Sequence, residues 1–439
     1  MVRILDPWIA PLVIVFNFIT IEYSLQEKAC LCCTKRTIWS IIVIMKIDTV
    51  INEITPYYKD LRRHLHSMPE IGFKEYKTAN FIIQELERLG VEYQKGVGGT
   101  GIVAWIKNGT SERSIALRSD MDALYIQERN NFAYASKNPG LMHACGHDGH
   151  MAIMLGAIEA IATQKAELDG TVYFIFQPAE EGLGGAKAMV EDGLFERFKI
   201  DKIFGIHNRP TEPYGKIFIK EGTMMASYDN YQIEILGKST HSSMPHTGKN
   251  PIVAAAHIVA AMKSITSLDL SPNAKSVVTV ASIHGGEADN IIPDNCIIRG
   301  SIRAFEKEVR KAIETRVKEI ATHMAQGFGM EAKIEYHTGY PATVNTDIQS
   351  ALQAAVATVG ESNTITDFTP SYGSEDFSYF LEQKPGCYAW LGSGKCEEQP
   401  MTLHSSSFDF NDDIIPIGVR YYYEIAKRGL GIQNSDVTI

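Results

Sequence analysis

The segment that most constrains this chain is residues 142–150, which reads Met-His-Ala-Cys-Gly-His-Asp-Gly-His. So many of its side chains need polar partners that we expect the segment to lie outside the hydrophobic core. Its two glycines favour a bent backbone rather than regular structure, and a bend brings neighbouring side chains to one point. Sulfur beside imidazole suits a transition metal such as zinc or a manganese-class ion. The segment predicts a metal-binding loop; a polar loop with a chance cluster of histidines is the alternative.

Length and composition limit the class of protein. The chain has 439 residues, too many for one ordinary core, which predicts two domains. It is 45% hydrophobic and 21% charged, as is typical of a soluble globular protein, and its net charge of -10 excludes a basic surface for nucleic acid. The spacing of Cys145, Cys296, Cys387 and Cys396 is not that of a disulfide framework, so we expect a reducing cytoplasm.

The first 44 residues differ in character from the rest. Residues 7–21 are apolar and uncharged, but they are short for a membrane span and are interrupted by Pro11 and Asn17. No small-residue cleavage site of a signal peptide follows them. An ordinary amphipathic helix begins after Met45. We therefore predict that residues 1–44 are a non-native extension and that Met45 is the true first residue; a disordered or membrane-anchoring extension is the alternative.

Hydrophobic periodicity from residue 45 to residue 226 alternates between the helical and the strand period. It predicts helices at residues 47–65, 76–89 and 151–163, and strands at residues 102–106, 114–117, 171–176 and 203–206. This alternation predicts an α/β fold with a mostly parallel sheet.

Acidic or histidine residues follow three of these strands. The strand at residues 114–117 runs into Asp120 and Asp122, and the strand at residues 171–176 is followed by Glu180 and Glu181. The strand at residues 203–206 ends at His207. In open parallel sheets, ligands bind beyond the carboxyl ends of the strands. These side chains are therefore expected to converge on one site.

The pattern changes near residue 228. Strands are predicted at residues 229–236, 276–283, 296–305 and 331–337, and helices at residues 250–265 and 306–327. Their order is that of a ferredoxin-like βαββαβ unit, which predicts an inserted domain at residues 227–337. A helix at residues 348–359 returns to the first domain, so that domain comprises residues 45–226 and 338–439.

A two-metal hydrolase needs ligands from several loops and a carboxylate that activates water. The candidates are Cys145, His147, Glu180, Glu181, His207 and His404. Adjacent glutamates are usually solvated, but this pair follows a buried strand and Pro178, and one glutamate can bind metal while its neighbour takes a proton. A single histidine such as His207 or His404 is more often a core or surface residue than a metal ligand.

Seven motifs occur in an order that resembles the metallo-aminoacylase and carboxypeptidase family, and within it the hippurate hydrolase and indole-acetyl–amino acid hydrolase branch. They are residues 118–124, 142–150, 177–182, 207–208, 241–246, 290–294 and 374–377. Each motif is weak alone, but together they are specific and cover about residues 50–430. The resemblance implies a mostly parallel-sheet, metallopeptidase-like catalytic domain in which residues 227–337 form a ferredoxin-like lid or dimerisation domain.

The resemblance also implies roles for the clustered side chains. Two divalent metal ions per subunit, manganese or zinc with cobalt or nickel as alternatives, would be bound by Cys145, His147, Glu181, His207 and His404. Cys145 would bridge or nearly bridge the ions, and Glu180 would be the general base. Asp122 would hydrogen-bond a ligand histidine and fix its tautomer. Asp120 stands where the wider family has a ligand histidine, and His147 would supply the replacement. His143 and His150 would orient the loop.

Substrate-binding roles follow from the same resemblance. His241 would reach the active site of the other subunit in a homodimer and polarise the scissile carbonyl. Asn290 and Arg303 would bind the substrate carboxylate, because a guanidinium pairs bidentately with it. A surface role for His241 and a structural ion pair for Arg303 are the alternatives.

These inferences predict a cytoplasmic, metal-dependent amidohydrolase that cleaves N-acyl amino acids, such as hippurate-like substrates, with a metal-activated water. A dipeptidase or an N-acetyl-diaminopimelate deacetylase is the alternative. A non-catalytic metal-binding protein is disfavoured because it would not need Glu180. We expect a small-molecule substrate and a homodimer or dimer-based oligomer, with no nucleic-acid partner and no membrane unless residues 1–44 are native.

Overall fold

The computed structural model describes residues 46–395 and 402–431. The predictions for residues 1–44 and for Cys396 lie outside the described residues.

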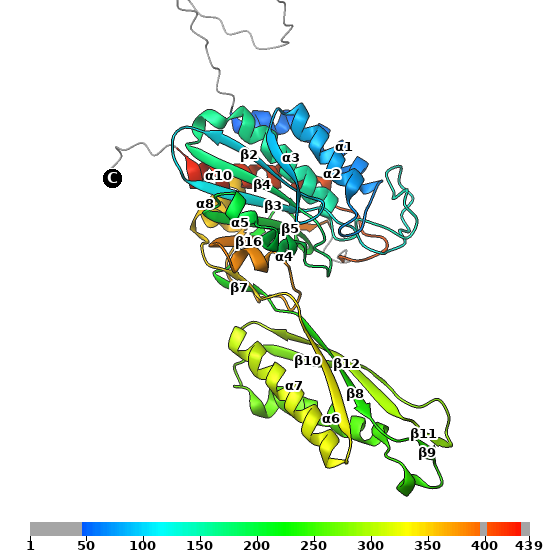
Figure 1. Ribbon diagram of the computed structural model, residues 1–439. Helices are drawn as coiled ribbons and strands as arrows, with labels where there is room; N and C mark the ends of the chain where they lie inside the picture. The colour runs from blue at the N-terminus through cyan, green and yellow to red at the C-terminus, as the bar shows by residue number, and fades with distance from the viewer. Residues whose placement is uncertain (1–45, 396–401, 432–439) are drawn as a thin grey trace, which may run out of the picture. The chain divides into compact units, whose positions relative to one another are not determined.

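A large mixed sheet forms the centre of the fold (Figure 1), with the strand order β1-β2-β4-β3-β5-β16-β6-β15 in the described part of the chain. Its middle strands, β4 (Gly170–Gln177), β3 (Ser114–Asp120), β5 (Lys202–Pro213) and β16 (Gly386–Gly394), pair in parallel. The antiparallel pairs lie toward the edges: β1 (Glu92–Val97) with β2 (Gly101–Asn108), β2 with β4, and β16 with β6 (Ile217–Phe218). The predicted mostly parallel sheet is confirmed in its central strands.

Helices cover both faces of this sheet because successive side chains of each strand point to opposite faces. Ile115 and Leu117 pack with the cluster that includes α1 (Ile47–His66), α3 (His147–Thr163) and α10 (Ile415–Leu430), whereas Ala116 packs in the cluster on the other face. The remaining helices of this part are α2 (Tyr76–Arg88), α4 (Gly185–Glu191), α5 (Leu194–Arg197), α8 (Gln349–Val359) and α9 (Ser378–Leu381). The predicted helices and strands of this part are all present.

A second sheet has the order β10-β12-β8-β13, with every neighbouring pair antiparallel. Its elements are β8 (Asp229–Leu236), α6 (Pro251–Ser264), β10 (Ser276–His284), β12 (Asn295–Ala304), α7 (Lys307–Gly327) and β13 (Glu331–Thr338). The sheet and its two helices share a separate hydrophobic cluster. This is the βαββαβ order of a ferredoxin-like unit, as predicted. The domain boundaries stay predictions.

Shorter elements complete the described part of the chain. The short strands are β7 (Gly222–Met225), β9 (Thr240–His241), β11 (Ile291–Ile292), β14 (Thr343–Asn345) and β15 (Thr364–Ile365). The single helical turns lie at Lys165–Glu167, Pro245–Thr247, Ile265–Asp269, Glu361–Asn363 and Asp412–Ile414. By length and composition alone, the helical stretch Pro251–Asp269 could cross a membrane, a test that a core helix of a soluble protein also passes.

The expectation that residues 142–150 lie outside the core and outside regular structure was wrong. Cys145, His147 and His150 are 7%, 0% and 2% exposed, and α3 begins at His147. Polar side chains tolerate burial when other elements supply partners, and here β3 and β5 supply partners to Cys145 and His150, whereas α1 supplies them to Asp148. The expected bend is present at Gly146, whose φ of 98° is left-handed, and a Cβ there would lie 2.4 Å from the Asn208 side chain.

Candidate active site

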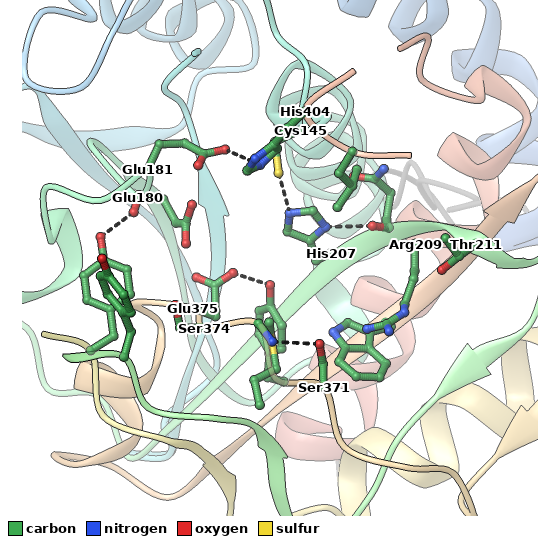
Figure 2. Close-up of a pocket in the computed structure, with 18 of the residues that line it drawn as sticks. Cys145, Glu180, Glu181, His207, Arg209, Thr211, Ser371, Ser374, Glu375 and His404 are labelled. Carbon is green, nitrogen blue, oxygen red and sulfur yellow. Dashed lines mark hydrogen bonds and ion pairs between the residues drawn. The ribbon is translucent and has the colours of Figure 1, made fainter. Parts of the chain in front are cut away.

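A cavity of about 510 Å³ lies beyond the carboxyl ends of β4 and the neighbouring strands. Six of the residues selected from the sequence line it, namely Cys145, Glu180, Glu181, His207, Arg303 and His404. Figure 2 shows the side chains of Cys145, Glu181, His207 and His404 pointing toward one another. The strand ends therefore converge as the pattern predicted.

The loop that follows β4 is held in a strained conformation. Ala179 has a φ of 53°, a region that non-glycine residues seldom adopt. Its amide donates to Glu75 Oε1 at 2.8 Å, and the amides of Glu180 and Glu181 donate to the two carboxylate oxygens of Asp122, each at 3.0 Å. Three successive amides bound by two buried carboxylates determine where the two glutamate side chains begin.

Tyr340 secures the same loop from another segment. Its hydroxyl donates to the Glu180 carbonyl oxygen at 2.6 Å and accepts from the Gly184 amide at 3.1 Å. The tyrosine thus bridges the two ends of the turn, so the loop is fixed from both sides.

Two histidines present one ring nitrogen to the cluster because the other nitrogen is already used. Nδ1 of His147 donates to the Asp122 carbonyl oxygen at 2.8 Å, and Nδ1 of His207 donates to the Asn208 carbonyl oxygen at 2.7 Å. A carbonyl only accepts, so Nδ1 of each ring carries a hydrogen and Nε2 is the atom that can bind a metal. For His207 this atom lies 3.3 Å from Cys145 Sγ. This arrangement is typical of metal-binding histidines.

The ligand atoms lie close enough to share metal ions. Those of Cys145, Glu181 and His404 all lie within 4.8 Å of one another, and so do those of His147, Glu180 and Glu181. Nε2 of His147 and Oε1 of Glu181 are buried and have no hydrogen-bond partner among the described residues, although His404 Nε2 lies 3.2 Å from that oxygen. Leaving such atoms unsatisfied costs about 1–3 kcal/mol each, a cost that a cation would remove. The residues present fit a divalent metal centre.

Electrostatics also favour positive charge in this cluster. Burial, and next the charges of Glu181 and Glu180, raise the pKa of the Cys145 thiol well above its usual range. Burial, and next Glu375, raise the pKa of Glu180. Burial alone would lower the pKa of His147, but Asp120 and then Asp122 raise it to about 10. A bound cation would stabilise the thiolate and carboxylates and displace the proton of the imidazole.

A buried ion network lies behind the cavity. Arg118 is fully buried, with Nη1 2.7 Å from Asp120 Oδ2 and Nη2 2.9 Å from Glu375 Oε1 and 3.2 Å from Asp376 Oδ1. Its Nε donates to Gln177 Oε1 at 2.7 Å. One guanidinium therefore holds the ends of β3 and β4 to residues 375–376.

Asp120, His143 and His150, from the motifs at residues 118–124 and 142–150, are buried beside the site. Oδ1 of Asp120 lies 2.7 Å from Nδ1 of His150, whose Nε2 lies 2.7 Å from Asn208 Oδ1. His143 is buried, and neither of its ring nitrogens has a hydrogen-bond partner among the described residues. Burial lowers its pKa to about 4.

Of the predicted substrate-binding residues, Arg303 lines the cavity and the other two do not. Arg303 Nη1 donates to Ser374 Oγ at 3.1 Å, and its guanidinium carbon lies 4.3 Å from the centre of the Tyr228 ring. His241 and Asn290 are exposed and lie together, since the Ser242 amide donates to the Asn290 carbonyl oxygen. Within one chain Asn290 therefore lies beside His241 and not at the cavity, and the substrate-binding roles of His241, Asn290 and Arg303 stay predictions.

Sequence reasoning missed several residues that shape the site. Glu75 and Tyr340 hold the loop after β4, Glu375 accepts from Arg118, and Arg209 and Trp390 line the cavity. Glu375 belongs to the motif at residues 374–377, but the motif alone did not predict its pairing with Arg118. Glu75 reads as an ordinary surface acid before a helix, and no local signal distinguishes it.

Comparisons with known proteins agree with this geometry. Residues 116–428 match the model of Peptidase family M20/M25/M40, and the hippurate hydrolase of Campylobacter jejuni is 40% identical over 388 residues, which cover 88% of this chain and 100% of that protein. The chain belongs to Peptidase family M20/M25/M40. The IAA-amino acid hydrolase ILR1-like 2 of Arabidopsis thaliana, 37% identical over 391 residues, covers 86% of this chain and 88% of its own length.

A solved structure of the M20 family is similar over most of the chain. The YXEP protein of Bacillus subtilis, described as a dinuclear metal binding peptidase, is 34% identical with a TM-score of 0.73. The match covers 86% of this chain and 98% of that one. The predicted family, fold class and assignment as an amidohydrolase enzyme are confirmed.

Replacing His207 with alanine is expected to lower the metal content of the purified M20 enzyme. The change removes the ring nitrogen that lies beside Cys145 Sγ. Loss of a residue that only supports a metal ligand lowers metal affinity ~10- to 100-fold, and loss of a ligand itself should lower it by at least as much. Metal per chain is measured by mass spectrometry after dialysis. His284→Ala, at an exposed histidine of β10, is the control. Unchanged stoichiometry in His207→Ala would remove this residue from the ligand set.

Alkylation of Cys145 in the metal-free enzyme is expected to prevent added metal from restoring activity, and metal bound beforehand is expected to block the alkylation. The thiol lines the cavity, whereas Cys296 and Cys387 are buried in other parts of the fold and serve as internal controls. Peptide mass spectrometry after prolonged iodoacetamide treatment at alkaline pH, which favours the thiolate of a cysteine with a raised pKa, reads each cysteine separately. Equal modification of Cys145 with and without metal would contradict thiolate ligation.

Proposed function

We propose that this chain is a metal-dependent amidohydrolase that cleaves the amide bond of N-acyl amino acids, with Glu180 as the general base. The observation that carries the proposal is the pairing of two adjacent glutamates with different surroundings. The Glu181 carboxylate faces Cys145 and His404, whereas the Glu180 carboxylate lies beside it in the same cavity. A purely structural metal site has no use for that second carboxylate.

The proposed metals are two divalent ions per subunit, manganese or zinc. The residues that would hold them are Cys145, His147, Glu181, His207 and His404. The ions, when bound, supply Lewis-acid chemistry that makes water more acidic and polarises an amide carbonyl. The mixed sulfur, nitrogen and oxygen donors support a transition metal rather than magnesium or calcium.

The chain's own residues perform the proton transfers. Glu180 would accept the proton of the attacking water and later deliver it to the leaving amine nitrogen. The backbone bonds from Asp122 and Tyr340 keep its side chain aimed at the ligand cluster. Of the three acids that line the described part of the cavity, Glu181 faces the other proposed ligands and Glu375 is held by Arg118, which leaves Glu180 for this role.

The proposed substrate class rests on the cavity and on the relatives. Hippurate hydrolase and IAA-amino acid hydrolase are named for acylated amino acids. Arg303 presents a guanidinium to the cavity and would bind the α-carboxylate as a bidentate pair. A volume of about 510 Å³ is in the range of small-molecule sites.

We further propose a homodimer in the cytoplasm. Ile252 and Val253 of α6 are exposed, and β10 lies at an edge of its sheet, two features that a second copy could cover. In such a dimer, the exposed pair of His241 and Asn290 would serve the cavity of the partner. The free state of Cys145, Cys296 and Cys387 supports a reducing compartment.

A substrate and metal panel tests the proposed function. Enzyme stripped with a chelator is reloaded with manganese, zinc, cobalt or nickel and assayed on N-benzoylglycine, N-acetyl and indole-acetyl amino acids, dipeptides and N-acetyl-diaminopimelate. We expect hydrolysis of the N-acyl amino acids in the presence of metal. Exclusive cleavage of dipeptides or of N-acetyl-diaminopimelate would favour the alternative activities, and no turnover of any substrate would overturn the proposal.

A further inference from the structure

The cavity extends along β5 beyond the metal-ligand cluster. All of residues 207–211 of β5 line the cavity, and Arg209 and Thr211 carry the polar side chains beyond His207 and Asn208. Figure 2 shows Arg209 on the opposite side of His207 from Glu180 and Glu181. This wall can therefore contact a part of the substrate that lies away from the glutamate pair.

Arg209 is held in position by an aromatic ring, and its nearest carboxylate is too far away for a hydrogen bond. Its guanidinium carbon lies 3.7 Å from the centre of the Trp390 ring, which stands opposite His207 on β16. Its Nε is buried without a hydrogen-bond partner among the described residues, and the carboxylate of Glu212 lies 3.6 Å from that atom. The side chain is 27% exposed. Stacking on an aromatic ring orients a guanidinium and leaves its edge available for an anion.

The cavity thus contains two guanidinium groups on separate supports. Arg303 comes from β12 and is held by Ser374 and Tyr228, whereas Arg209 comes from β5 and is held by Trp390. One guanidinium fork binds one carboxylate through two parallel hydrogen bonds, so two guanidinium groups on separate elements can each bind an anion of their own. The Glu212 carboxylate lies 3.6 Å from Nε of Arg209, too far for a hydrogen bond, and a second anion in the cavity could hydrogen-bond the exposed edge of this guanidinium directly.

We propose that Arg209 binds a second anionic group of the substrate. The preferred substrates are then N-acyl amino acids with a carboxylate besides the α-carboxylate, carried by the amino-acid side chain or by the end of the acyl group. This inference rests on the proposed function, in which Arg303 binds the α-carboxylate and the amide bond is cleaved.

Matched pairs of substrates test the inference on the metal-loaded enzyme. N-benzoylglutamate is compared with N-benzoylglutamine for a side-chain carboxylate, and N-succinyl-leucine with N-succinamoyl-leucine for an acyl carboxylate. We expect kcat/KM to favour the acid of at least one pair by ~10-fold or more, the effect of one charge-assisted contact. The pair that shows the preference identifies which end of the substrate reaches Arg209.

Variants connect the preference to the residue. Arg209→Gln should reduce the acid-to-amide ratio to near one, and Arg209→Lys, which keeps the charge without the fork, should leave an intermediate ratio. Arg299→Gln, at an exposed arginine of β12, is the matched control and should keep the ratio. The Kd of N-benzoylglutamate and N-benzoylglutamine, measured by calorimetry on the Glu180→Gln background, gives the same comparison without turnover.

The outcomes separate this inference from the proposed function. If the wild-type enzyme hydrolyses N-benzoylglycine and both amides but shows no preference for either acid, the second anion site is refuted and the function stands. A preference that survives in both Arg209 variants would also refute it and would leave Arg209 as a support for Trp390. Failure to hydrolyse any of these substrates would refute the function itself.

Discussion

Replacing Glu180 with glutamine is expected to lower kcat by about 10²- to 10⁴-fold while the enzyme keeps its metal. Glutamine preserves the shape of the side chain but cannot accept the proton of the attacking water. The backbone bonds that place residue 180 come from Asp122 and Tyr340 and do not involve the side chain, so the loop should keep its conformation. Steady-state kinetics on N-benzoylglycine and metal analysis of the same sample measure both effects.

Two further variants make this result specific. Glu181→Gln should lower the metal content, because that carboxylate faces Cys145 and His404. Glu191→Gln, at an exposed glutamate of α4, should change neither turnover nor metal content. Near-normal turnover in Glu180→Gln would exclude this residue as the base, and loss of metal would make it a ligand.

Replacing Arg118 with methionine is expected to lower the free energy of unfolding by about 3–5 kcal/mol. Methionine fills a similar length, but it leaves the carboxylates of Asp120, Glu375 and Asp376 buried without their shared cation. Removing one partner of a buried ion network is far more destabilising than removing an exposed ion pair. Denaturation by urea, followed by circular dichroism, measures the change.

The matched control is Arg197→Met, which breaks an exposed pair with Asp192 and should change the stability by no more than about 1 kcal/mol. Combining Arg118→Met with Asp376→Asn should recover part of the loss, because one uncompensated charge is removed. A loss below about 1 kcal/mol in Arg118→Met would mean that the three carboxylates are neutral or solvated in the folded protein.

The positions of helices and strands could be predicted because periodicity is a local property. The alternation at residues 229–236 and the apolar run at residues 203–206 each appear as strands. β5, however, continues to Pro213, well past the expected end. Its extension pairs with β16, which lies far along the chain, and this pairing puts Arg209 on the cavity wall. Local patterns carry no information about such a partner.

The sequence by itself determined which side chains could form a metal site. Cysteine, histidine and paired glutamates just beyond buried strands supply the sulfur, nitrogen and oxygen donors of a transition-metal site, and parallel strands bring their carboxyl ends to one edge. Tertiary structure alone decided that residues 142–150 are buried, that Glu75 holds the amide of Ala179, and that Arg118 joins three carboxylates. The physical reason is that a buried polar group is stable only with partners, and the sheet order, not the neighbouring sequence, brings those partners to it.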